Sequence, residues 1–371
     1  MPVRNSACIH TGALKRGQST IVKSISYPKI NNDQILIKAV AYAANPTDWK
    51  HIAVNWGGKG AIAGSDVSGI VSEIGSNVKG FEVGDIVSSF MHGNFTEARG
   101  AFSEYVIADV NTTIKYDKSN FNSQALEEGD HRSDFINTYE GAASVTLGLC
   151  TIGVSFHYHL GIKIDKQANA SKYILIWGGA TGTGILAIQI AKLIYGLNVI
   201  TTASSNHHNF LRTLGADEVF DYHDPDVVDQ IKKVGNANIN YALDTVSDTQ
   251  TFQSVYDATV ETKEVAIDNL LFLKLDEAKM DPSRKITSTS TLVFHVDGTE
   301  MNLDGLIIPP DMELVKVYND FWFNVLPPYI SKIKHADLKV LKAGLESANE
   351  ALDLLRDNKI KAEKIVFRLS A

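Results

Sequence analysis

The stretch YILIWGGATGTGILAIQIAK, residues Tyr173 to Lys192, decides the fold of this chain. It opens on a continuous apolar run, Tyr173 to Trp177, as expected of a parallel strand that is covered on both faces. A seven-residue turn follows, four of whose residues are glycine, and an amphipathic helix is expected from Gly184. Strand, glycine turn and helix in this order are typical of a site where a pyrophosphate approaches the N–H groups at the positive end of the helix.

The turn supplies the expected pyrophosphate contacts, because glycine lets the backbone turn sharply and a diphosphate come close. Its residues are Gly178, Gly179, Ala180, Thr181, Gly182, Thr183 and Gly184. The literal G-x-G-x-x-G/A pattern matches only from Gly182 to Ala187, so the order of the elements supports the interpretation more than the pattern does. The alternative is an ordinary glycine turn between a strand and a helix of an α/β domain.

A second apolar run, residues 197–202, has the length of a strand, and the residues after it bear on which dinucleotide binds. NAD sites usually place an Asp or Glu about 20 residues past the glycines to bind the ribose hydroxyls. Here residues 203–208 read ASSNHH, and no acid occurs before Asp217. We therefore expect nothing to repel a 2′-phosphate and NADPH to bind at least about tenfold tighter than NADH, although the usual Arg or Lys is missing. The alternative is a polar loop that lacks acids by chance.

Composition bounds the class of protein. At 371 residues the chain is long enough for two domains, and 44% apolar with 21% charged residues is typical of a globular protein. A net charge of -8 offers no basic field, so we expect neither nucleic acid nor a membrane as a partner. The N-terminal residues have no apolar segment, and only Cys8 and Cys150 are present. We expect a reducing compartment, the cytoplasm, with the nucleus as an alternative.

The pattern of the chain changes near residue 141. Residues 21–109 contain short runs with strand character, at 35–41, 67–74, 86–90 and 102–107, which predict a compact β-rich unit. After residue 141, strands and helices alternate, which predicts a parallel doubly wound sheet with strands at 173–177, 197–202, near 219, at 239–244 and at 290–296. The charged segment 274–285 is expected to be a solvated loop or a frayed helix. Near the C-terminus, leucines and an alanine recur at helical spacing from Leu341 to Leu355, and 364–369 is expected to be the last strand.

Several segments, in order along the chain, resemble one superfamily, the medium-chain dehydrogenases/reductases. NPTDWK (45–50), GSDVSG (64–69), VGDIV (83–87) and GAFSEY (100–105) resemble successive motifs of its chaperonin-10-like, or GroES-like, catalytic domain. The glycine turn, LGAD (214–217) and FDY (220–222) resemble its cofactor domain. The resemblance implies an α/β fold: a Rossmann-type doubly wound parallel sheet, expected at residues 141–309 as the NADPH-binding domain, and a β-rich GroES-like catalytic domain, expected at residues 1–140 with 310–371.

The chain departs from the zinc alcohol dehydrogenases of that superfamily. They need a Cys where the segment NPTDWK lies and Gly-His-Glu where this chain has Gly64, Ser65 and Asp66, and they carry a four-cysteine lobe that is missing here. We therefore expect no metal site, and the nearest likeness is to zinc-independent quinone oxidoreductases and to fungal trans-acting enoyl reductases. The resemblance implies NADPH-dependent reduction of an activated C=C bond, in an enoyl, enal or enone substrate, or of a quinone. The partner would be a small-molecule substrate.

The resemblance also implies roles for single residues. Ser204, His207 and Tyr222 fall where relatives bind the 2′-phosphate, with His207 replacing a common Lys. Asn45 and Thr151 fall near the nicotinamide and its ribose, and Lys50 falls near the substrate carbonyl. Lys50 and Thr151 are the candidate catalytic donors to the substrate carbonyl. For Lys50 the alternative is an exposed surface lysine, and for Thr151 a buried threonine bonded to its own helix.

Two questions stay open in the sequence. The alternative function is a dinucleotide-binding redox sensor or scaffold of the same fold without useful turnover. The oligomeric state is either a monomer or a homodimer. The superfamily often dimerises through the edge strand of the cofactor sheet, expected here near 290–296, and the charged segment before it would be able to block that pairing.

Overall fold

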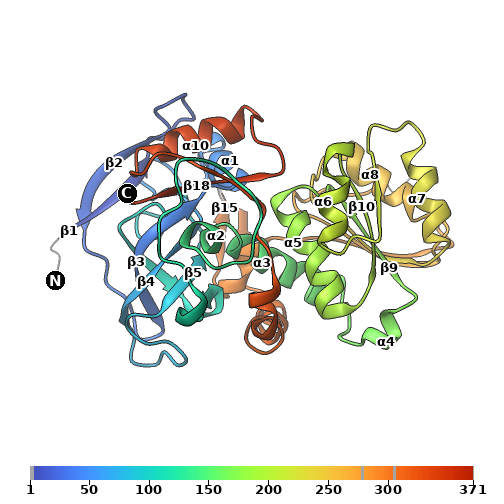
Figure 1. Ribbon diagram of the computed structural model, residues 1–371, viewed down its shortest axis with the longest axis horizontal. Helices are drawn as coiled ribbons and strands as arrows, with labels where there is room; N and C mark the ends of the chain where they lie inside the picture. The colour runs from blue at the N-terminus through green and yellow to red at the C-terminus, as the bar shows by residue number, and fades with distance from the viewer. Residues whose placement is uncertain (1–3, 277–279, 304–305, 371) are drawn as a thin grey trace. The chain divides into compact units, whose positions relative to one another are not determined.

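The structure is a computed structural model that describes residues 4–276, 280–303 and 306–370. The chain forms two compact units, and each is described by itself (Figure 1). The first unit comprises residues 1–147, 296–311 and 334–371, and the second comprises residues 148–295 and 312–333.

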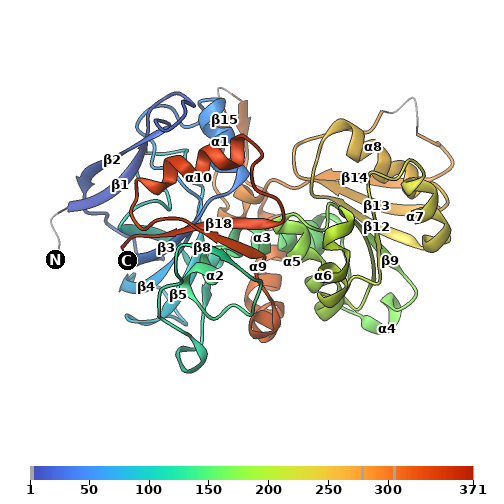
Figure 2. The same ribbon diagram turned by 45° about the horizontal axis from the view of Figure 1, so that its top comes forward.

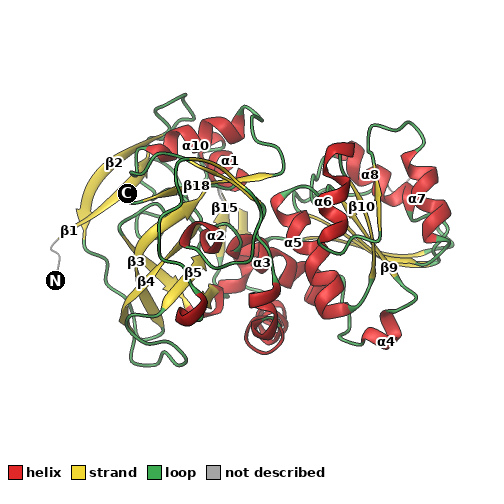
Figure 3. Cartoon of the chain, viewed as in Figure 1, coloured by secondary structure: helices red, strands yellow, loops and turns green. Residues whose placement is uncertain are grey.

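The first unit is built on an eight-stranded sheet, which Figure 3 shows in yellow. Its strand order is β7-β5-β4-β3-β18-β17-β8, and β6 also pairs with β3. All its pairs are antiparallel except β17 with β18. The strands are β3 (Gln34–Ala43), β4 (Asp66–Ile74), β5 (Ile86–Phe90), β6 (Tyr105–Asp109), β7 (Thr113–Lys115), β8 (Gly129–His131), β17 (Asp337–Val340) and β18 (Glu363–Arg368). Two short antiparallel pairs complete the set: β1 (Arg4–His10) with β2 (Thr20–Ser26), and β15 (Met301–Leu303) with β16 (Leu306–Ile308).

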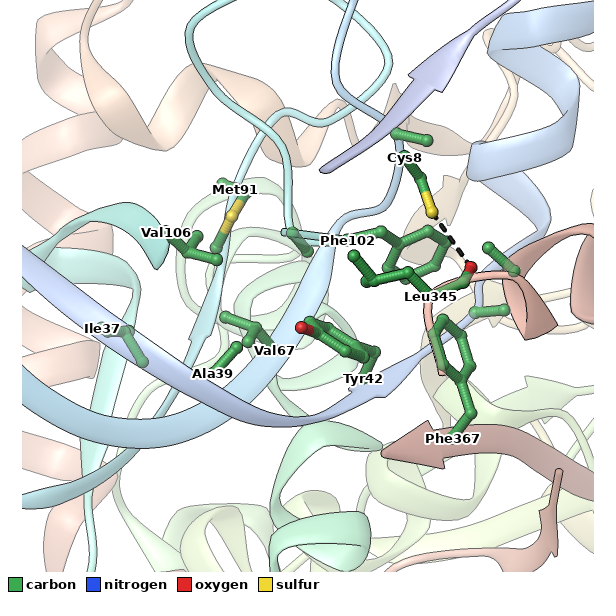
Figure 4. Close-up of a cluster of buried hydrophobic side chains, with 14 of the residues drawn as sticks. Cys8, Ile37, Ala39, Tyr42, Val67, Met91, Phe102, Val106, Leu345 and Phe367 are labelled. Atoms are coloured by element: carbon green, nitrogen blue, oxygen red, sulfur yellow. Dashed lines mark hydrogen bonds between the residues drawn. The ribbon is translucent and has the colours of Figure 1, made fainter. Parts of the chain in front are cut away.

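The core of this unit is aromatic. Tyr42, Phe102 and Phe367 are fully buried, and their ring centroids lie 5.1 to 5.8 Å apart. Figure 4 shows Cys8 above these rings, where its Sγ donates a hydrogen bond to the carbonyl oxygen of Leu345 over 3.1 Å. Burial raises the pKa of the Cys8 thiol to about 12, so it is an inert core residue. The helices of the unit are α1 (Pro46–Ala53), α2 (Tyr139–Ala143) and α10 (Ser347–Arg356), and α3 (Thr146–Ile152) begins in it.

The second unit contains a six-stranded parallel sheet in the order β11-β10-β9-β12-β13-β14. Its strands are β9 (Tyr173–Trp177), β10 (Asn198–Thr202), β11 (Glu218–Phe220), β12 (Ile239–Asp244), β13 (Glu264–Asn269) and β14 (Lys285–Ser290). When the six strands are numbered by their order along the chain, they lie in the order 3-2-1-4-5-6 across the sheet. This is the strand order of a doubly wound dinucleotide-binding sheet. Together with the β-rich first unit, it confirms the predicted fold class.

Helices cover both faces of this sheet. Figures 1 and 2 show α7 (Val227–Gly235) and α8 (Thr249–Ala258) together on one face, where Ile231, Phe252 and Val255 pack against the strands. On the other face lie α5 (Gly182–Ile190) and α6 (His208–Thr213). The remaining helices are α4 (Lys166–Asn169) and α9 (Met312–Asp320), with π-helical turns at Gly153–His159, Ala191–Tyr195 and Phe321–Val325.

Three predictions about secondary structure are wrong in detail. The last strand of the parallel sheet is β14, not residues 290–296, because the polar, β-branched run KITSTS forms the exposed edge strand while the apolar residues after it are buried in a 3₁₀ turn at Val293–Asp297. Leu341 and Leu345 are buried ahead of α10, which begins only at Ser347. The helix after the glycine turn begins at Gly182, two residues earlier than predicted.

The charged segment 274–285 falls partly outside the described residues. In its described part, Arg284 donates from its guanidinium to the carbonyl oxygens of Thr259 and Thr262 at the end of α8, and Leu275 and Met280 pack on the core. The described residues form no helix and are mostly exposed, as expected of a solvated loop, and these contacts attach the loop to the second unit.

The compact units do not divide the chain where the predicted domains do. Residues 296–309 lie in the first unit, where the side-chain amide of Asn111 donates to the carbonyl oxygen of Val296 over 2.7 Å. Residues 312–333 lie in the second unit, where the hydroxyl of Tyr318 donates to Sγ of Cys150 over 3.2 Å.

Candidate functional site

The glycine turn of the second unit is folded against its own strand ends. Gly178 adopts a φ of +84°, in the left-handed region that favours glycine. The hydroxyl of Thr245 approaches the carbonyl oxygens of Trp177 and Gly178 at 2.8 and 2.9 Å and holds the start of the turn. A Cβ at Gly179 would lie 2.1 Å from Oγ1 of Thr201, and one at Gly184 would lie 2.3 Å from the carbonyl oxygen of Gly178. Only glycine fits at these positions.

At the N-terminus of α5, three backbone N–H groups make no hydrogen bond within the described residues. Thr181 caps the helix, because its Oγ1 accepts the N–H of Gly184 over 2.9 Å. The N–H groups of Ala180, Gly182 and Thr183 have no hydrogen-bond partner among the described residues. A helix N-terminus with free N–H groups and a positive dipole binds anions, so the residues present fit a pyrophosphate.

The ends of the next two strands lie beside each other. Because Thr202 of β10 is level with Phe220 of β11, Ser204 and Tyr222 come together at the same edge of the sheet, and Oγ of Ser204 donates to the hydroxyl oxygen of Tyr222 over 3.2 Å. Tyr222 is 46% exposed. His207 lies three residues after Ser204, half-buried, at the end of a short 3₁₀ turn. Two of the three predicted 2′-phosphate residues are thus in direct contact.

The same register brings an acid to this place, and one premise of the sequence analysis is therefore wrong. Oδ2 of Asp221 accepts the N–H of Ser205 over 3.0 Å, and Oδ1 accepts both the N–H of His223 over 3.0 Å and its Nδ1–H over 2.7 Å. The backbone N–H of His223, first among several donors, holds the pKa of Asp221 below its usual value, so this carboxylate is ionised. Asp221 follows the third strand of the sheet, β11, and not the second strand, β10, after which the acid of an NAD site usually comes.

In the first unit, six polar residues form what we call the buried polar cluster: Asn45, Asp48, Ser65, Asp66, Asn94 and Lys364. Within it the N–H of Asn45 donates to Asp48 over 2.8 Å at the start of α1, and Ser65 and Asn94 donate to Asp48 over 2.6 and 3.1 Å. The side-chain amide of Asn45 donates to Asp66 over 2.9 Å and accepts a hydrogen bond from the ammonium of Lys364. That ammonium also lies 3.9 Å from Asp66.

The electrostatics of the buried polar cluster follow from its burial. Asp48 and Asp66 are fully buried, and burial raises their pKa values to about 6 and about 7. Burial also lowers the pKa of Lys364, although both carboxylates oppose that shift. Lys364 is the cation that offsets the charge of the two acids. No sequence motif marks it, because it is the second residue of β18, about 300 residues after them in the chain.

The remaining predicted site residues lie in different units. Both polar ends of the Asn45 side chain are engaged inside the buried polar cluster, so in this structure it ties α1 to β4 and β18. Lys50 lies half-buried on α1, burial lowers its pKa, and it has no ion-pair partner among the described residues. Thr151 lies buried on α3 in the second unit. The catalytic roles of Lys50 and Thr151, and the cofactor contact of Asn45, stay predictions.

A search of the described residues for groups of three or more His, Cys, Asp or Glu side chains that could hold a metal ion finds none. At the segments where zinc-dependent relatives would need ligands, the chain places Asn45, Ser65 and Asp66, all three inside the buried polar cluster. Among the residues that the structure describes, no helix has the length and apolar character needed to cross a membrane.

Comparison with known proteins agrees with this geometry. The family model for the alcohol dehydrogenase GroES-like domain matches residues 31–118, and the model for the zinc-binding dehydrogenase family matches residues 182–268. The chain is 33% identical to the uncharacterized protein YNL134C of Saccharomyces cerevisiae, across 95% of this chain and 96% of that protein. It is 29% identical to the trans-enoyl reductase resD of Aspergillus sclerotiorum, across 95% and 98%.

Among solved structures, the Escherichia coli quinone oxidoreductase complexed with NADPH superposes with a TM-score of 0.69 at 16% identity, covering 98% of this chain and 99% of that one. At this identity the likeness shows the fold alone. With the fold, the two family matches and the full-length relatives together, the chain belongs to the medium-chain dehydrogenase/reductase superfamily, in the branch of zinc-independent quinone oxidoreductase-like and enoyl reductase-like proteins.

Proposed function

We propose that the protein is a zinc-independent, NADPH-dependent oxidoreductase that reduces an activated carbon–carbon double bond, in an enoyl, enal or enone substrate, or a quinone. The observation that carries the proposal is the glycine turn, in which Ala180, Gly182 and Thr183 keep free N–H groups and no side chain fits at Gly179 or Gly184. A trans-enoyl reductase relative and a structural neighbour that was solved with NADPH support the choice of reaction and cofactor.

In this proposal, the second unit binds the cofactor. The free N–H groups at the start of α5 bind its pyrophosphate, and Ser204, His207 and Tyr222 donate hydrogen bonds to its 2′-phosphate. When bound, NADPH supplies the hydride for the reduction. The exposed hydroxyl groups at the ends of β10 and β11 support NADPH over NADH, although no Lys or Arg occurs in residues 203–209 or 220–224.

Lys50 and Thr151 are the proposed donors to the carbonyl oxygen of the substrate, on which negative charge develops as the hydride arrives. The ammonium Nζ of Lys50 suits this task because burial lowers its pKa, which makes it a stronger proton donor than a solvated lysine. No carboxylate in the described residues pairs with it, and its recorded neighbour is the ring of Trp49, whose centroid lies 6.0 Å from Nζ. The hydroxyl of Thr151 would add a second hydrogen bond.

The test is NADPH oxidation by the purified full chain with a panel of enals, enones, enoyl thioesters and quinones. We expect turnover with at least one class, and the same panel with NADH measures the cofactor preference. NADPH binding without turnover on the whole panel would contradict the enzyme and favour a dinucleotide-binding sensor or scaffold. No NADPH binding would contradict both.

A further inference from the structure

One charged group at the edge of the parallel sheet has no role in the proposed function. The carboxylate of Asp221 lies beside the two residues that would bind the 2′-phosphate, because it bonds to the N–H of Ser205 while Ser204 bonds to Tyr222. It is the first residue after β11, and β11 pairs in parallel with β10. The acid that binds the ribose hydroxyls in a dinucleotide site normally follows the second strand of the sheet. Here the acid at that place, Asp221, follows the third strand.

The surroundings of Asp221 only partly offset its charge. His223 donates to it from Nδ1, and its ring lies 4.1 Å from that of Tyr222 between centroids. The other titratable groups on the neighbouring turn are His207 and His208, and Nε2 of His208 bonds to the carbonyl oxygen of Ala203. Residues 203–209 and 220–224 contain no Lys or Arg. A 2′-phosphate at this place would meet hydroxyl and imidazole donors together with the carboxylate of Asp221, and the exposed Asp224 lies three residues further along the same turn.

We propose that Asp221 is a specificity-determining residue that disfavours the 2′-phosphate and so limits the preference of this protein for NADPH over NADH, while His223 partly shields it. The inference rests on the proposed function, since it concerns the cofactor that this function uses. Each carboxylate oxygen has two lone pairs, and Oδ2 of Asp221 uses only one, so it can also accept a hydrogen bond from a ribose 2′-hydroxyl. Asp221 would thus repel the phosphate of NADPH and hold the hydroxyl of NADH.

The test is calorimetric titration of wild type and Asp221→Asn with NADPH and NADH. Adenosine 2′,5′-bisphosphate and AMP, which lack the nicotinamide, serve as further probes. Removing one charge a few ångströms from a phosphate at a solvated site should tighten NADPH and the bisphosphate about three- to tenfold. NADH and AMP should bind equally or more weakly than to wild type. The gain should shrink at high salt, because salt screens the repulsion.

Asp224→Asn is the matched control, because Asp224 is exposed, lies in the same turn and makes no side-chain hydrogen bond among the described residues. It should leave the ratio of the NADPH and NADH dissociation constants unchanged. Asp221→Ser is a second variant in case the asparagine distorts the turn, since a serine hydroxyl can also accept the N–H of His223. Both Asp221 variants should shift the ratio in the same direction.

The outcomes separate the two proposals. Wild type that binds dinucleotides, with a ratio that neither Asp221 variant shifts beyond the Asp224 control, overturns the inference and leaves the proposed function standing. Wild type that binds none of the four probes overturns both. A ratio that moves toward NADPH in both Asp221 variants supports the role of Asp221.

Discussion

The glycine turn of the second unit and the buried polar cluster of the first unit are built in opposite ways. The turn is a backbone structure, in which a left-handed Gly178 and two positions without room for a Cβ bring N–H groups to one end of α5. The buried polar cluster is formed by side chains. The ammonium of Lys364 bonds to Asn45, lies 3.9 Å from Asp66 and offsets the charge of the two buried acids. The turn should therefore govern binding, and the cluster should govern stability and the placement of α1.

The largest effect is expected in the buried polar cluster. Lys364→Met removes the cation that the described residues place there and leaves Asp48 and Asp66 buried without it. Breaking a buried ion pair in this way costs about 3–5 kcal/mol of the free energy of unfolding. Chemical denaturation followed by circular dichroism measures it.

The matched control for that variant is Lys285→Met, since Lys285 forms an ion pair with Glu264 whose side chains are 75% and 70% exposed. An exposed pair contributes about 1 kcal/mol or less. Equal losses in both variants would mean that the cluster is no more important to stability than a surface pair.

A smaller effect is expected at Lys50. Lys50→Met removes a proposed donor to the substrate oxygen and should lower kcat about 100-fold, the lower end of what such donors contribute. The dissociation constant of NADPH should not change, because the cofactor is expected on the second unit. Steady-state kinetics with the best substrate of the panel measures the loss, and Lys29→Met, an exposed lysine, is the control. If the Lys50 variant has the kcat of wild type, Lys50 is a surface lysine without a catalytic role.

The buried polar cluster should also make stability depend on pH. In the folded chain, burial raises the pKa of Asp66 from 3.8 to about 7, so the folded state holds that proton more tightly than the unfolded state does. The resulting contribution to stability is present at low pH and is lost as pH rises from about 4 through 7. Asp66→Asn cannot lose a proton there, so the stability of wild type relative to this variant should fall across that range, by at most about 1.4 kcal/mol per pH unit. A constant difference would show that Asp66 does not titrate near neutrality.

No effect is expected from chelators. Asn45 and Ser65 stand where zinc-dependent relatives need ligands, and a lysine supplies the positive charge of the buried polar cluster. Turnover should be the same with and without EDTA. Activity that EDTA removes and zinc restores would contradict the zinc-independent assignment.

The contrast between the two regions also explains what the sequence could predict. The strand β9 and the glycine turn lie in one continuous stretch of chain, so the sequence predicts the strand and the place of the turn, although α5 begins at Gly182 inside the predicted turn. The buried polar cluster joins Asn45, Asp66 and Lys364 from three separate segments, and no local pattern marks Lys364 as their partner. Asp221 was overlooked for the same reason, because only the pairing of β10 with β11 brings it to Ser205. The edge strand β14 was misplaced because its residues are polar, and a search for apolar runs passes over them.

If the pyrophosphate of NADPH lies on the glycine turn, Gly182→Val should disrupt its binding most directly. Gly182 opens α5 and offers one of the free N–H groups, so a branched side chain there should obstruct the phosphate without entering the core. Calorimetric titration should show NADPH affinity reduced by about two orders of magnitude or more, with a melting temperature close to that of wild type. A folded Gly182→Val variant that binds NADPH as wild type does would show that the cofactor does not use this turn, and the proposed function would lose its basis.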